Sequence, residues 1–131
     1  FLGFKDFQQL TLIQKHIFKN KIHTKIISCK TVRENNGVAF SSRNFNLNKN
    51  QMKIAEKVYN YLINIKKKTK KNSKLFNPLL FKKDLIKLGV NKIDYLEIIN
   101  LKSLSRPRKL NDSFNIFIAY YLNKVRLIDN I

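Results

Sequence analysis

Hydrophobic residues recur at two spacings along this chain of 131 residues. In some segments they return every three or four positions, which is typical of one face of a helix. In others they alternate or cluster with β-branched neighbours, as strands do. This pattern predicts helices at about 4–18, 50–68 and 78–88. It predicts strands at about 24–32, 93–99, 114–122 and 125–129.

Capping residues define several of these boundaries. Asn48 or Asn50 can accept hydrogen bonds at the start of the second helix. Asn77 precedes a proline at the first position of the third helix, and Gly89 ends that helix. Asn123-Lys124 supplies a tight turn between the last two strands. After its first third, the chain is therefore expected to form an α+β unit, two helices against an antiparallel sheet.

The charge adds a competing hypothesis. The formal net charge is +19, and a run of basic residues lies at Lys66–Lys71, before Asn72 and Ser73. Clustered cations favour nucleic acid, so a basic RNA-binding or ribosome-associated module is the alternative function. However, 22 lysines stand against 5 arginines, and asparagine and isoleucine are also abundant, as in proteins from A- and T-rich genomes. We therefore expect the lysine run to be a frayed helix end and linker, and Arg106-Pro107-Arg108 to lie in a loop.

Cysteine and histidine residues indicate little further chemistry. Cys29 is the only cysteine, so no internal disulfide is possible, and its apolar strand pattern predicts a buried, inert thiol. His16 and His23 have no partners at ligand spacing, so no metal site is expected. No apolar run approaches the roughly 18 residues of a membrane span, and a cytoplasmic location is the default. Phe1-Leu2 before Gly3 looks like the end of a strand, so we expect a fragment with its N-terminal portion missing.

Polar residues concentrate in the segment 31–44, which surrounds Gly37. Ser41, Ser42 and Arg43 bring two hydroxyls and a guanidinium that could enclose a phosphate. A surface turn with an N-cap serine is an equally good interpretation of these residues. A second candidate is the turn after Gly3, because a strand end followed by a helix N-terminus can hold an anion or nucleotide.

Three stretches resemble the pantoate–β-alanine ligase family, also called pantothenate synthetases. They are Phe-Leu-Gly-Phe-Lys-Asp-Phe-Gln-Gln-Leu at 1–10, Thr-Val-Arg-Glu-Asn-Asn-Gly-Val-Ala-Phe-Ser-Ser-Arg-Asn at 31–44 and Arg-Leu-Ile-Asp-Asn at 126–130. Asp94-Tyr95-Leu96-Glu97 matches a family strand, and the resemblance runs from Phe1 to Asn130. It implies a mixed α/β and α+β fold. Residues 1–45 would be the C-terminal edge of a Rossmann-like nucleotide-binding domain, and 46–131 a small lid of helices on an antiparallel sheet.

The resemblance also implies an activity. ATP and pantoate would give pantoyl adenylate and pyrophosphate, and β-alanine would then give pantothenate and AMP. Mg²⁺ would accompany ATP, with its ligands in the missing N-terminal part, and the full-length enzyme would be a homodimer without nucleic-acid or membrane partners. The family's His-x-x-His signature is absent, so this chain alone is not expected to turn over. A catalytically dead remnant is a further alternative.

Site residues carry over from the resemblance one by one. Lys5 would neutralise charge on the α-phosphate, Asp6 would bind the ribose, Gln9 would bind pantoate, and the backbone at Val32 would recognise adenine. The catalytic set implied is Lys5, Ser41, Ser42 and Arg43, and the ATP-binding set adds Gly3, Phe4, Asp6, Val32 and Phe40. Phe4 and Phe40 depart from the usual family residues, as do Tyr121, Val125 and the turn between them. We also expect exposed apolar surface on the first helix, at Phe7, Leu10, Ile13 and Ile17.

Overall fold

The computed structural model describes residues 1–72, 75–107 and 113–131. Short strands and a helix form the first part: β1 (Leu2–Gly3), a 3₁₀ turn η1 (Phe4–Asp6), α1 (Phe7–Lys19) and β2 (Ser28–Cys29). After a second 3₁₀ turn, η2 (Ser42–Asn46), come α2 (Lys49–Lys71), α3 (Pro78–Lys87), β3 (Lys92–Asn100), β4 (Phe114–Leu122) and β5 (Val125–Asn130). The mixed α/β class predicted from the sequence is confirmed. Arg108 and Ser73 lie outside the described residues.

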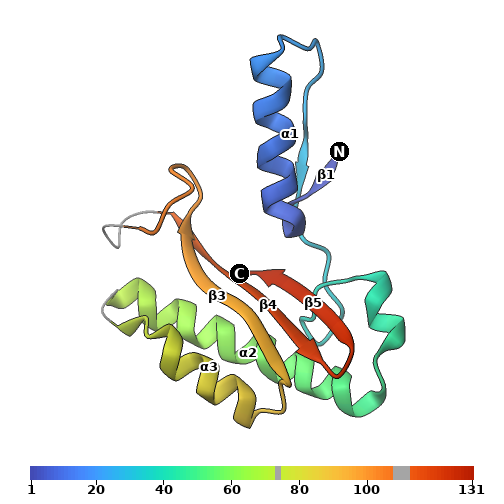
Figure 1. Ribbon diagram of the computed structural model, residues 1–131, viewed down its shortest axis with the longest axis vertical. Helices are drawn as coiled ribbons and strands as arrows, with labels where there is room; N and C mark the ends of the chain where they lie inside the picture. The colour runs from blue at the N-terminus through green and yellow to red at the C-terminus, as the bar shows by residue number, and fades with distance from the viewer. Residues whose placement is uncertain (73–74, 108–112) are drawn as a thin grey trace.

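The three long strands form one antiparallel sheet in the order β3-β4-β5, and α2 and α3 lie together across one face of it (Figure 1). The core between these layers includes Leu62 of α2, Leu85 of α3 and Ile116 of β4, each at most 1 % exposed. Burial of one such side chain contributes roughly 1.5–3 kcal/mol. The predicted hairpin is confirmed: Asn123 takes φ +52 in the turn that joins β4 to β5.

Helix α2 begins with a capping box. Asn48 Oδ1 accepts from the Gln51 N–H at 2.9 Å, and Gln51 Oε1 accepts from the Asn48 N–H at 2.8 Å, so Asn48 is the cap. The helix continues to Lys71, so the prediction of a frayed linker in the lysine run is wrong. Two features attach the end of the helix to the rest of the fold. Thr69 is buried, and Lys66 donates to Asn115 Oδ1 of β4 at 2.8 Å.

The strand predicted at 24–32 is much shorter than its composition suggests. Only Ser28 and Cys29 pair, in parallel with Leu2 and Gly3. Cys29 is exposed, so the prediction of a buried thiol is wrong. A β-rich pattern needs neighbouring strands and a covered face to become buried, and among the described residues only β1 pairs with this strand. Within the same residues, no helix combines the length and apolarity needed to cross a bilayer.

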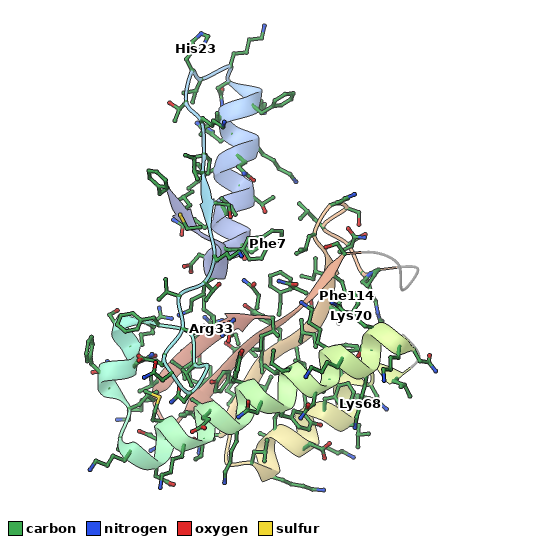
Figure 2. The ribbon with its side chains drawn as sticks, turned by 180° about the vertical axis from the view of Figure 1, so that it is seen from behind. Phe7, His23, Arg33, Lys68, Lys70 and Phe114 are labelled. Atoms are coloured by element: carbon green, nitrogen blue, oxygen red, sulfur yellow. The ribbon has the colours of Figure 1, made fainter. Side chains whose placement is uncertain are left out.

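Helix α1 projects away from the body that holds the three-stranded sheet, and the segment leading to β2 returns beside it (Figure 1). The expectation of an exposed face is wrong at Leu10, which is 3 % exposed, whereas Leu12 and Phe18 are the exposed ones. Phe7 lies at the base of α1 (Figure 2). The centre of its ring is 5.4 Å from that of Phe117 on β4. The start of α1 therefore rests on the sheet.

Candidate active site

The turn from β1 into α1 carries four of the predicted site residues, Gly3 to Asp6. Lys5 is half-buried, and its Nζ donates to the carbonyl oxygen of Phe40 at 3.2 Å. Burial lowers the pKa of Lys5, while the carboxylates of Asp129 and Asp6 oppose that shift. The contact with Phe40 brings together two predicted segments that lie 35 residues apart.

The second segment folds into a narrow loop around Gly37. Arg33 and Ala39 form an antiparallel bridge, and the Glu34 N–H donates to Val38 O at 2.8 Å. Gly37 takes φ +87, a backbone conformation that favours glycine. The Phe40 N–H then donates to Val32 O at 2.9 Å, so the segments before and after Gly37 lie side by side. Val32 itself is 71 % exposed, so its side chain is free of the core.

Ser41, Ser42 and Arg43 leave this loop at its end. Ser41 Oγ accepts from the Arg43 N–H at 3.3 Å and caps η2, so the N-cap interpretation of Ser41 is confirmed. Ser42 and Arg43 are exposed, and Arg43 Nη1 donates to Arg126 O of β5 at 3.3 Å. The exposed guanidinium thus lies beside the edge strand β5.

Arg33 links the loop to the end of β5 (Figure 2). Its Nη1 and Nη2 donate to the Asp129 carboxylate at 2.7 and 3.0 Å, a bidentate ion pair. The same guanidinium donates to Gly37 O at 3.0 Å and lies 4.8 Å from the centre of the Tyr59 ring. Burial acts to lower the pKa of Arg33, but the hydrogen bond and charge of Asp129 prevail and raise it.

An open groove is lined by Phe4 of the turn and by Ser28, Lys30, Thr31 and Arg33, together with Asn115, Asn130 and Ile131. Lys30 adds a positive charge to this lining, whereas the charge of Arg33 is balanced by Asp129. Lys5 and Arg43 are close enough for the charge of Arg43 to lower the pKa of Lys5. Lys5 and Arg43, two neighbouring cations, form a surface that suits an anion such as a phosphate chain.

The chain matches the family model described as pantoate-beta-alanine ligase over residues 1–131. The chain belongs to the pantoate–β-alanine ligase family. It is 36 % identical over 133 residues to a pantothenate synthetase of Flavobacterium psychrophilum, covering 100 % of this chain and 47 % of that protein. A pantothenate synthetase of Clostridium botulinum is 37 % identical over 99 % of this chain and 47 % of its own length. The chain thus spans about half the length of these curated relatives.

Solved structures of the family agree with the fold. The pantothenate synthetase of Thermus thermophilus superposes with a TM-score of 0.84 at 25 % identity, over 98 % of this chain and 47 % of that one. The pantoate-beta-alanine ligase of Francisella tularensis gives a TM-score of 0.71 at 35 % identity, over 99 % of this chain and 41 % of that one. The latter was solved in complex with β,γ-ATP and β-alanine.

Not every predicted site residue of this ligase-family chain joins the cluster around Lys5. Gln9 lies one turn into α1 and is exposed, and Asp6 is exposed beside Lys5. No group of three or more His, Cys, Asp or Glu side chains gathers within the described ranges. Sequence reasoning left Arg33, Asp129 and Asn130 out of the site. The only signal for the last two was their place in the family-like stretch 126–130.

Proposed function

We propose that the protein containing this chain is an ATP-dependent, AMP-forming ligase that joins pantoate to β-alanine. In this proposal residues 1–45 belong to a Rossmann-like ATP domain and residues 46–131 form the lid over it. The parallel pairing of β1 and β2 around α1 supports the first assignment, because a β-α-β unit is the building block of such domains. The antiparallel sheet under α2 and α3 supports the second.

The observation that carries the proposal is the contact between Lys5 and Phe40. It joins the turn at 3–6 to the loop that ends at Ser41, Ser42 and Arg43. By resemblance, both segments bind ATP in this family, and they meet here around two cations. In the Francisella tularensis relative, the compounds bound are β,γ-ATP and β-alanine, which fits the substrates proposed.

The chemistry needs charge stabilisation and no protein nucleophile. The pantoate carboxylate attacks the α-phosphorus, an oxygen–phosphorus bond forms, and the bond to pyrophosphate breaks. The β-alanine amine then attacks the acyl carbon of the adenylate, AMP leaves, and the amine loses a proton. Lys5 and Arg43 would hold the phosphate oxygens as charge develops, and Ser42 would donate through its hydroxyl.

Mg²⁺ accompanies ATP by the same resemblance. The described residues gather no set of carboxylates that would hold it, and Asp129 is committed to Arg33. We therefore assign no step to the metal in this chain. Homodimer formation through other parts of the protein likewise remains an expectation from the family.

The test is AMP formation by the intact gene product that contains this chain, with ATP, Mg²⁺, pantoate and β-alanine. We expect AMP only when both pantoate and β-alanine are present. Arg43→Ala and Lys5→Ala should each lower kcat about 10²–10³-fold, the loss typical of one positioned donor to a developing oxyanion.

Matched controls exist for both variants. Arg106→Ala and Lys87→Ala remove exposed cations from outside the candidate site, and each should retain nearly full turnover. AMP release that ignores pantoate, or equal losses in the control variants, would contradict the proposal. If no turnover is seen, a steep salt dependence of RNA binding would favour the basic module. The absence of both turnover and RNA binding would favour a dead remnant.

A further inference from the structure

Asn130 is a buried asparagine whose side chain reaches the candidate site from the far end of the chain. It is 3 % exposed at the end of β5. Its Nδ2 donates to the carbonyl oxygens of Phe4 and Lys5 at 2.8 and 2.9 Å. Its Oδ1 accepts from Asn115 Nδ2 at 3.2 Å, so the amide is oriented by all three contacts. Both donors therefore go to the turn that carries Lys5.

The neighbouring groups tie the second ATP-binding segment to the same point. Arg33 donates to Asn130 O at 3.2 Å and to the carboxylate of Asp129. The Asn130 N–H donates to Asp129 Oδ1 at 2.8 Å. Asn130 thus holds the turn that carries Lys5, and the adjacent Asp129 holds the loop around Gly37 through Arg33.

We propose that Asn130 is a positioning residue that fixes Lys5 against the proposed phosphate-binding segment, residues 40–43. This inference rests on the function proposed above. Its Nδ2 donates to the carbonyls on either side of the Lys5 Cα, so these bonds set the backbone from which the Lys5 side chain extends. Lys5 Nζ then reaches Phe40 O, on the residue before Ser41. A displacement of about 1 Å in a catalytic group can lower turnover about 10²-fold, so this anchor matters for rate.

The chemistry of the contact explains why an amide is needed. Aspartate has nearly the same shape, but a carboxylate oxygen in place of Nδ2 would face two carbonyl oxygens and repel both. Asn130→Asp should therefore be worse than Asn130→Ala, which only leaves the two carbonyls unpaired.

A purely structural role is the rival explanation, and the same sheet offers a matched control. Asn100 at the end of β3 is 7 % exposed, and its Oδ1 accepts from the N–H groups of Lys102 and Ser103 at 2.8 and 3.0 Å. Asn100→Ala also removes a buried side chain with two bonds to backbone groups. Asn100 touches neither ATP-binding segment. A general loss of stability should therefore occur in both Asn100→Ala and Asn130→Ala, whereas displacement of Lys5 should occur only in Asn130→Ala.

The experiment compares kcat and KM for ATP in the intact gene product carrying Asn130→Ala, Asn130→Asp or Asn100→Ala. We expect kcat to fall about 10–100-fold in the Asn130 variants, as for other residues that orient a catalytic ligand, with near-normal turnover for Asn100→Ala. In a Lys5→Ala background the Asn130→Ala change should cause little further loss. Equal kcat values for Asn130→Ala and Asn100→Ala, or full additivity with Lys5→Ala, would overturn the proposal.

A readout independent of turnover separates this inference from the proposed function. Amide hydrogen exchange at residues 4–8 should accelerate in Asn130→Ala and stay unchanged in Asn100→Ala. Unchanged exchange in Asn130→Ala would overturn the anchoring itself. A wild-type protein without substrate-dependent AMP formation would instead refute the ligase, and with it the catalytic part of the inference.

Discussion

Gly37 shows how one missing side chain shapes the loop beside the candidate site. A Cβ at this position would lie 2.1 Å from Cε1 of Tyr59, much closer than two non-bonded carbon atoms can approach. The Tyr59 ring in turn lies under the Arg33 guanidinium. Glycine is therefore required at position 37 for two reasons: its φ of +87, and the Tyr59 ring that fills the place of a Cβ.

Gly37→Ala is expected to destabilise the fold. The left-handed backbone alone costs roughly 1–2 kcal/mol for an L-residue, and displacement of Tyr59 adds to that. Chemical denaturation would measure the loss. Gly3→Ala is the matched control, because Gly3 has φ −70 and no heavy atom within 4 Å of the place that a methyl group would take. A similar loss in both variants would refute this explanation.

At the scale of elements, Lys66 is where the lysine run becomes part of the fold. Its Nζ lies against β4, whereas Lys68 and Lys70 lie near the end of α2 that is remote from Arg33 (Figure 2). Burial, together with the charge of Lys70, lowers the pKa of Lys66 to about 8. The helix therefore docks through a cation that releases its proton more easily than an exposed lysine.

Docking of α2 should strengthen as pH rises above about 8. Between that value and the ordinary lysine pKa of 10.5, the unfolded chain binds more protons at Lys66 than the folded one, so the free energy of unfolding increases with pH. Denaturation midpoints from pH 7 to 10 would measure the slope. Lys66→Met keeps the apolar stem and should flatten this component, while Lys67→Met should leave it in place.

For the whole molecule, the sequence predicted what depends on local patterns. The helical spacing and the caps at Asn48 and Asn77 located α2 and α3, and the Asn123 turn located the hairpin. The strand at 24–32 was overestimated, because propensity does not report how many strands lie beside it. Ser41, Ser42 and Arg43 were suggested by their chemistry and the other site residues by resemblance. Asn130 was missed as a site residue because its partners Lys5 and Phe4 are 125 and 126 residues away.

The Arg33–Asp129 ion pair joins the loop around Gly37 to strand β5, and breaking it should weaken the packing of the loop on the sheet. Asp129→Asn is expected to lower the free energy of unfolding by about 1.5–3 kcal/mol, the usual worth of hydrogen bonds to a charged group. The two side chains are only 22 % and 10 % exposed, so solvent screens them little. Denaturation with Asp94→Asn as control would test this. Asp94 pairs with Arg126 at the surface, so its loss should matter much less.

The bonds from Asn130 to Phe4 and Lys5 span almost the full length of the chain, and this bears on the order of folding. A ring that closes over so many residues loses far more chain entropy than the β4–β5 hairpin, with roughly 0.6 kcal/mol added for each doubling of length. Such a long-range contact must overcome this closure cost before it is rewarded, so we expect it to form late. We therefore expect the sheet and its two helices to assemble first and the candidate site around Lys5 to be completed last, when Asn130 meets the turn at 4–5.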